Sequence, residues 1–166
     1  LLALLKDFAQ ESNYFSFYER NLYFYDTYIE KANKTVQSNP FVSILENEFG
    51  KQQNSYNYVI SALMKGNFGI YFQNSVTQKA DIFSVFSSDD FSLSPAILLH
   101  EYSHSFINPL TEKYHDIVQK HQGTYDILAQ YKLPNYQSGY EGWEECVNEH
   151  LVRAMAIHIL LSLIHI

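Results

Sequence analysis

Residues 100–104 read His-Glu-Tyr-Ser-His, and the residue types and spacing of this segment suit hydrolysis at a metal ion. On a helix, residues four apart lie on one face, so His100 and His104 can present two imidazoles to one Zn²⁺ at about 2.0–2.1 Å. Glu101 lies a quarter-turn from the first histidine, where its carboxylate can reach a metal-bound water without binding the metal. The pattern also arises by chance, and the alternative is two histidines hydrogen-bonded in a core beside a solvated Glu101.

A catalytic zinc ion usually has three protein ligands and one water, so a third ligand must come from another part of the chain. The extended HExxHxxGxxH pattern is excluded, because Ile107 and Leu110 stand where it needs Gly and His. A peptide-deformylase arrangement needs a cysteine before the motif, and the single cysteine, Cys146, follows it. Acidic ligands after the motif therefore remain.

Glu149 is the acidic residue that we favour as the third ligand. It lies in the middle of a predicted helix over residues 142–160, with Val152 and Ala156 on its face, so its carboxylate is expected to point inward. A carboxylate in such a place must be neutralised, paired or bound to metal. Arg153, one turn further on, could pair with it or orient it.

Two rivals to this ligand stay open. Glu145 lies one turn before Glu149 on the same predicted helix, but near the helix start, where the dipole favours a carboxylate without any metal. Asp126 partly matches the GTxDxxYG motif of the aspzincins, although Ala129 and Gln130 replace the Tyr and Gly of that motif. Thr124 as a helix N-cap, with Asp126 in the first turn, explains this segment without a metal.

The histidine motif must be held by a helix, and its flanks predict one. Ser94 is a suitable N-cap, Pro95 suits the first helical position, and an apolar face begins directly afterwards. We expect this helix to end at Asn108-Pro109. The predicted helix over 142–160 then brings the third ligand.

The chain before the motif changes from helical to strand periodicity. Residues 2–34 predict one long amphipathic helix or two stacked ones with an aromatic core face, and a short helix follows from Pro40, N-capped by Asn39, to a stop at Gly50. Strands are predicted at Tyr56–Leu63, Phe68–Phe72 and Ala80–Phe86, the first two joined by a turn at 65–67. The predicted fold class is α+β, with N-terminal helices, a small and mainly antiparallel sheet, the motif helix and a C-terminal helix.

Composition limits the partners. The 166 residues, 46% hydrophobic and 17% charged, indicate one folded domain over 1–166. The net charge of −7 comes without a basic cluster, so we expect no nucleic-acid partner and no attraction to anionic membranes. The longest apolar runs are too short to cross a bilayer. The 14 Tyr and 12 Phe can fill a core, and tyrosines can also line a groove for a chain-like ligand.

The ends of the chain indicate a fragment truncated on both sides. It opens with Leu1 rather than Met, and the apolar stretch 160–166 resembles sequencing-adapter read-through, which predicts a non-native tail. A signal peptide could have been lost with the start of the chain, so the compartment stays open, with secretion or the cell envelope among the options.

The motif followed by a helix with a glutamate resembles the gluzincin clan of zinc metallopeptidases. Asn148-Glu149 is similar to the Asn-Glu pair of thermolysin-like members. More closely, residues 100–110 (HEYSHSFINPL) and 149–154 (EHLVRA) resemble an uncharacterised bacterial family, described as a domain of unknown function, of proposed gluzincin-type peptidases. One departure is that thermolysin-like enzymes have Asp where Arg153 stands, so the groups around the ligands differ.

The resemblance implies a zincin-like domain and a zinc-dependent peptidase acting on peptides or proteins. His100, His104 and Glu149 would be the zinc ligands, and Glu101 would be the catalytic acid and base. Zinc would lower the pKa of a bound water towards about 7 and polarise the carbonyl, and Glu101 would carry the water's proton to the leaving amine. The edge of the sheet at 68–72 would pair with an extended peptide.

A further donor should stabilise the oxyanion, and the sequence does not choose among its candidates. These candidates are His115, His121, Tyr136, Tyr140 and His150. Two other functions compete with hydrolysis. One is an inactive peptidase-like module that binds metal, or binds peptides through a tyrosine-rich surface, and the other is a helical interaction domain without metal.

Overall fold

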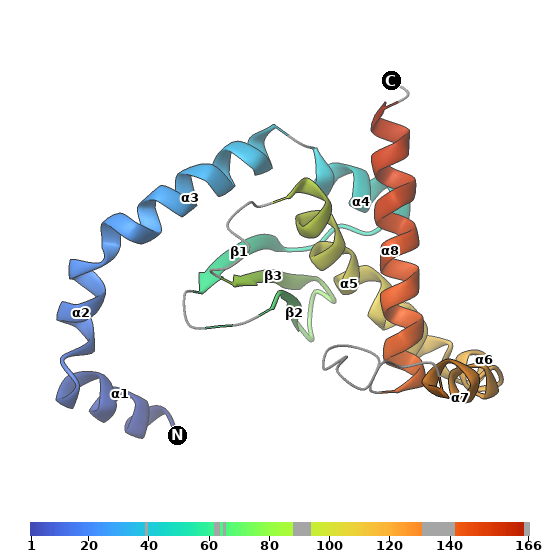
Figure 1. Ribbon diagram of the computed structural model, residues 1–166, viewed down its shortest axis with the longest axis horizontal. Helices are drawn as coiled ribbons and strands as arrows, with labels where there is room; N and C mark the ends of the chain where they lie inside the picture. Colours follow the sequence, from blue (N-terminus) through green and yellow to red (C-terminus); the bar gives the residue numbers. More distant parts are fainter. Residues whose placement is uncertain (39, 62–63, 65, 88–93, 131–141, 165–166) are drawn as a thin grey trace.

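The protein has an α+β fold, in which N-terminal helices precede a small mixed sheet and a group of C-terminal helices (Figure 1). The computed structural model describes residues 1–38, 40–61, 64, 66–87, 94–130 and 142–164. The first helices are α1 (Leu2–Glu11), α2 (Tyr14–Arg20), α3 (Leu22–Gln37) and α4 (Phe41–Phe49). The strands are β1 (Ser55–Ser61), β2 (Phe68–Gln73) and β3 (Ala80–Ser87). The last helices are α5 (Pro95–Lys113), α6 (His115–Gln119), α7 (Gly123–Gln130) and α8 (Trp143–Ile164).

The sheet has the order β1-β3-β2, with β1 parallel and β2 antiparallel to β3. The three strands were expected in these places, but a mainly antiparallel sheet with β1 turning directly into β2 was expected as well, and that pairing is wrong. The central place belongs to β3 because it is the most buried strand, with Ile82 and Phe86 on one face and Val85 on the other. Burial on both faces favours the middle of a sheet. Lys65 of the expected turn lies outside the described residues.

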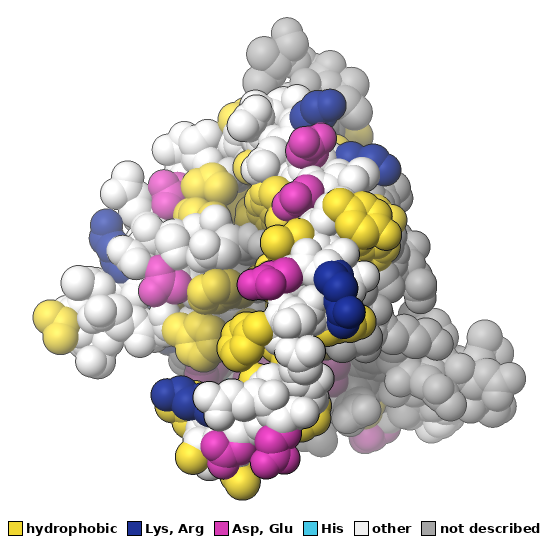
Figure 2. All heavy atoms as spheres, turned by 90° about the vertical axis from the view of Figure 1, so that its left-hand side faces the viewer, with side chains coloured by type: hydrophobic (Ala, Val, Ile, Leu, Met, Phe, Trp, Pro, Cys, Tyr) yellow, Lys and Arg dark blue, Asp and Glu magenta, His cyan; other side chains and the backbone are white. Residues whose placement is uncertain are grey.

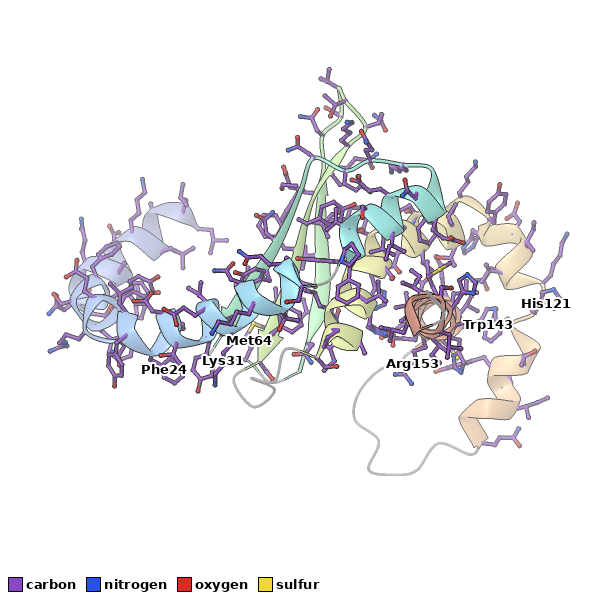
Figure 3. All side chains as sticks on the ribbon, turned by 90° about the horizontal axis from the view of Figure 1, so that it is seen from above. Phe24, Lys31, Met64, His121, Trp143 and Arg153 are labelled. Carbon is purple, nitrogen blue, oxygen red and sulfur yellow. The ribbon has the colours of Figure 1, made fainter. Side chains whose placement is uncertain are left out.

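The core lies between the sheet and α8, and α5 runs through it. It combines Phe41 and Leu45 of α4, Ile82 and Phe86 of β3, Leu98, Leu99, Tyr102 and Phe106 of α5, and Ala156 and Ile159 of α8. Figure 3 looks along the axis of α8 and shows α5 between the sheet and this helix. The motif helix is therefore covered on two sides, which fixes where its side chains point.

Helix α5 begins as predicted, with Ser94 at the N-cap position and Pro95 at the first helical position. It does not end at Asn108-Pro109, because the helix continues through Pro109 to Lys113. Proline inside a helix removes one hydrogen bond and crowds the preceding turn. Here Thr111, only 3% exposed, contacts Asn148 of α8, and this tertiary contact keeps the last turn helical.

The helix after α3 also follows its prediction closely. Gly50 ends α4 with a left-handed backbone (φ +60°), which glycine adopts without strain. The helix begins at Phe41, so Pro40 immediately precedes it rather than opening it. Asn39, the expected N-cap, lies outside the described residues.

Helices α1–α3 form an arm that leads away from the sheet (Figure 1). Three helices replace the one or two expected, because the chain is interrupted twice. Asn13 separates α1 from α2 in the left-handed region (φ 52°), which asparagine tolerates, and Asn21 separates α2 from α3 with a non-helical backbone (φ −107°, ψ 5°). The expected aromatic core face is wrong: α1 and α2 bury no residue, and α3 buries only Ala32. The aromatic rings of these helices contact one another instead. The ring centroids of Tyr18 and Tyr25, for example, lie 5.8 Å apart. Figure 2 views this side and shows hydrophobic side chains among acidic and basic ones.

None of the helices in the described part of the chain combines the length and the apolar character that crossing a membrane requires.

Candidate metal centre

Three side chains meet at one point between α5 and α8. The Nε2 atoms of His100 and His104 lie 3.3 Å apart, and the Glu149 carboxylate lies 3.6 Å from the first and 3.3 Å from the second. Glu149 approaches His100 through Oε2 and His104 through Oε1, and one ligand atom from each of the three residues lies within 4.8 Å of the other two. The three side chains are therefore close enough together to hold one metal ion. Among the residues that the structure describes, no other group of three His, Cys, Asp or Glu side chains comes this close.

Two elements position these side chains. Helix α5 presents its two histidines one turn apart, with their rings at 80° and 4.9 Å between centroids. Helix α8 lies against α5 through the buried Val152 and Ala156, and Glu149 is on that same face. Its side chain is 20% exposed, so the inward direction predicted for it is confirmed.

The electrostatics favour an ionised Glu149. The hydrogen bond with His104, aided by the charges of both histidines and of Arg153, outweighs burial and lowers the pKa of the Glu149 carboxyl. Arg153 is half exposed, and its Nη2 lies 3.4 Å from Glu149 Oε2, as expected for residues one turn apart. The carboxylate is thus available as an anionic ligand.

The pKa values of the two histidines are shifted in opposite directions. Burial and the neighbouring His104 lower the pKa of His100, although the Glu149 charge opposes them. Burial also acts to lower the pKa of His104, but hydrogen bonds with Glu149 and Asn108 and the charge of Glu101 outweigh it, so this pKa is raised. A histidine binds a metal ion only as the neutral ring, so metal binding would release any proton that Nε2 of His104 carries in the metal-free site.

Glu101 is buried beside these ligands, with 5% of its surface exposed. Burial is the main reason that its pKa is raised to about 7, with a smaller contribution from Glu149 that His104 opposes. The alternative that placed Glu101 on a solvated edge is therefore wrong. A carboxyl group that titrates near neutral pH is suited to general acid–base chemistry.

Gly69 of β2 contributes to the site by lacking a side chain, although no motif in the sequence includes it. A Cβ atom at this position would lie 2.7 Å from the backbone oxygen of Glu101 and 3.5 Å from Cβ of His104. The strand therefore runs directly against α5 at the motif. The available signal was a glycine inside a strand pattern, which often marks a close backbone approach.

The two rival acidic ligands lie elsewhere. Glu145 is exposed on α8 and does not belong to the cluster. Asp126 is exposed in the first turn of α7, as the metal-free interpretation expected. Thr124 is not the cap of that helix, because α7 begins at Gly123 and includes it.

The candidate oxyanion donors remain unassigned. His115 contacts Glu144 at 3.0 Å, and His150 is an exposed residue whose Nδ1 lies 2.7 Å from the Cys146 carbonyl. His121 is exposed beyond α6, on the side of α8 where Trp143 donates to the Val118 carbonyl (Figure 3). Tyr136 and Tyr140 lie outside the described residues.

A comparison with protein families matches residues 1–164 to a family model described as Domain of unknown function (DUF4932). No curated protein and no solved structure matches the chain.

Proposed function

The chain belongs to the DUF4932 domain family, and we propose that it is a zinc-dependent metallopeptidase of the gluzincin type. The observation that carries this proposal is the cluster of two imidazoles and one carboxylate, in which one ligand atom from each residue lies within 4.8 Å of the other two. Two histidines and one glutamate form the donor set of several catalytic zinc sites, which leave the fourth position to water.

The donor chemistry supports zinc over the hard cations. Magnesium and calcium prefer sets made of oxygen atoms, whereas imidazole suits zinc and its neighbours. The side chains of His100, His104 and Glu149 would hold the ion. When bound, zinc supplies a Lewis acid that lowers the pKa of a coordinated water towards about 7 and polarises a substrate carbonyl.

Glu101 is the residue that we propose as the general base. It follows a proposed metal-binding histidine in the chain, it is buried, and its side chain makes no hydrogen bond to any of the residues that the structure describes. Its carboxylate would accept a proton from the attacking water and deliver it to the leaving amine. This transfer is what distinguishes a peptidase from a protein that merely stores zinc.

An extended peptide is the substrate class that fits the strand beside the motif. Strand β2 pairs with β3 along one side, and within the described residues its other side has no strand partner. The strand passes the Glu101 backbone at Gly69. A peptide added to that edge by main-chain hydrogen bonds would lie next to the proposed base and ligands.

The alternative function is an inactive peptidase-like module that binds peptides. The observation that favours it is the set of exposed aromatic side chains on the arm, including Phe8, Phe15 and Tyr23. A buried Glu101 beside three potential ligands favours catalysis instead, because binding alone does not need this carboxyl group.

Hydrolysis of an unstructured protein by zinc-loaded wild type and Glu101→Gln protein separates the two functions. Glutamine keeps the size of the side chain but cannot accept the proton, so the rate should fall by about 10²–10⁴-fold while zinc is retained. Glu48→Gln, an exposed change of the same kind on α4, is the matched control and should leave the rate unchanged. Equal rates for wild type and Glu101→Gln would refute the assigned role.

A further inference from the structure

His104 has a hydrogen-bond partner at Nδ1, the ring nitrogen that does not face His100 and Glu149. Its Nδ1 lies 3.1 Å from Oδ1 of Asn108, which lies one turn further along the same helix. An amide oxygen can only accept a hydrogen bond, so this contact requires a proton on Nδ1. The neutral ring then keeps the lone pair of Nε2, the atom that faces Glu149 and His100.

A second polar contact joins the same turn of α5 to the helix that carries Glu149. The buried Thr111 hydroxyl lies 2.9 Å from the Asn108 carbonyl and also contacts the side-chain amide of Asn148. Both contacts place an acceptor oxygen against the hydroxyl, the Asn108 carbonyl and Oδ1 of Asn148, and one hydroxyl carries one proton, so Thr111 donates to one of them at a time. Asn148 directly precedes Glu149, so the contact fixes the position of α8 along α5 at the residue proposed as the third ligand.

The Thr111–Asn148 contact matters for the shape of α5 because Pro109 lies inside this helix. A proline inside a helix usually ends or bends it. Thr111 lies beyond that proline, on the part of α5 that would otherwise separate from the helix. The Thr111–Asn148 contact thus holds the end of α5 against α8.

We propose that Asn108, Thr111 and Asn148 are positioning residues of the metal centre. Asn108 holds His104 in the tautomer whose Nε2 binds the metal, and the Thr111–Asn148 contact holds Glu149 beside the two histidines. This inference rests on the proposed function to the extent that the site must bind a divalent metal ion, but it does not require hydrolysis.

The test is the zinc affinity of the 166-residue chain, measured by competition with a chromophoric chelator. Asn108→Ala and Thr111→Val should each weaken zinc binding by about 10–100-fold, the usual effect of losing a group that orients a ligand. Asn108→Asp keeps the acceptor and Thr111→Ser keeps the hydroxyl, so both should recover most of the affinity. The Co²⁺-loaded protein provides a second readout, since its visible absorption reports tetrahedral geometry.

The matched control is Ser105→Ala. It removes a buried hydroxyl from the same helix, one that donates to the Tyr102 carbonyl and not to α8. Thermal unfolding of the zinc-free proteins shows whether a variant is merely destabilised. A positioning role predicts that Thr111→Val and Ser105→Ala lower the melting temperature similarly, while only Thr111→Val loses affinity.

The Thr111→Val/Asn148→Leu double variant adds a sharper criterion. Because both changes break the same Thr111–Asn148 contact, their effects should not add. The double variant should bind zinc no more weakly than the single variant with the lower zinc affinity. Wild-type affinity in Asn108→Ala and Thr111→Val would overturn the positioning role and leave the proposed function intact. A wild type that takes up neither zinc nor cobalt would overturn both, and zinc binding without hydrolysis would overturn only the proposed function.

Discussion

Glu149 is the residue that decides which kind of metal site the proposed centre would be. Two histidines on one helix bind a metal weakly without a third ligand, and three carboxylates could in principle supply it. Glu149 lies within 3.6 Å of both imidazoles, while Glu145 and Asp126 are exposed elsewhere. Glu149→Ala should therefore lose most of the zinc retained after desalting, whereas Glu145→Ala and Asp126→Ala should keep it. Loss of the metal in Asp126→Ala alone would restore the aspzincin-like interpretation.

Glu101 leads to a prediction that can be tested without any metal ion. Its pKa is about 7 in the folded protein against 4.5 as the ordinary value, so the folded state holds an extra proton between these limits. Because the folded state binds more protons than the unfolded state there, the free energy of unfolding should fall as pH rises from about 4.5 to 7, by on the order of 3 kcal/mol. Glu101→Gln cannot ionise, so this part of the decline should be absent.

Unfolding of zinc-free wild type and Glu101→Gln across this pH range, by denaturant titration, measures the difference. Parallel profiles for the two proteins would show that the carboxyl of Glu101 is solvated rather than buried. Glu48→Gln serves again as control, because Glu48 is exposed and its loss should leave the profile unchanged.

Strand β2 and helix α5 are the elements whose spacing the site depends on. The backbone of β2 reaches α5 only because Gly69 has no side chain, and an added Cβ would meet the Glu101 carbonyl at 2.7 Å. Since that neighbour is backbone, either β2 or α5 must move. Gly69→Ala should destabilise the protein by about 1–3 kcal/mol, the usual cost of overpacking, and lower zinc affinity as His104 shifts.

Denaturant unfolding and zinc competition measure these two effects of Gly69→Ala. Gly66→Ala is a useful comparison, because Gly66 has open space around it but a left-handed backbone (φ +86°). It should cost stability through backbone strain alone and leave zinc affinity unchanged. An unaltered Gly69→Ala protein would mean that β2 does not lie against the motif.

Elements were predictable from the sequence wherever local patterns decide them. The strands, the start of α5 at Ser94-Pro95 and the stop at Gly50 follow from periodicity and from capping residues. The central place of β3 and the continuation of α5 through Pro109 depend on contacts between distant segments. Local patterns do not contain those contacts, so both were mispredicted.

The same distinction holds for the site. The spacing of His100 and His104 is a property of one helix, and it was enough to identify them as a pair. Glu149 was selected through the apolar face that it shares with Val152 and Ala156, and that face does lie against α5. Gly69, by contrast, belongs to the site only because the fold brings β2 to the motif.

At the scale of the whole molecule, the arm and the rest of the fold differ in how much they bury. The core joins α4, the sheet, α5 and α8, whereas α1 and α2 bury no residue. Deleting residues 1–20 should therefore change the free energy of unfolding by less than about 1 kcal/mol and leave zinc content unchanged. Denaturant unfolding and metal analysis of the shortened chain measure both. A large loss of stability would show that the arm is covered in the folded protein.

The proposed function depends on zinc being held between α5 and α8, and metal analysis of the purified chain tests this most directly. After zinc loading and desalting, wild-type protein should retain about one zinc ion per chain, and His100→Ala or His104→Ala should lose most of it. His115→Ala, which removes an exposed histidine that contacts Glu144, should retain the metal. Wild-type protein that remains free of metal after this treatment would contradict both the proposed metal centre and the proposed function.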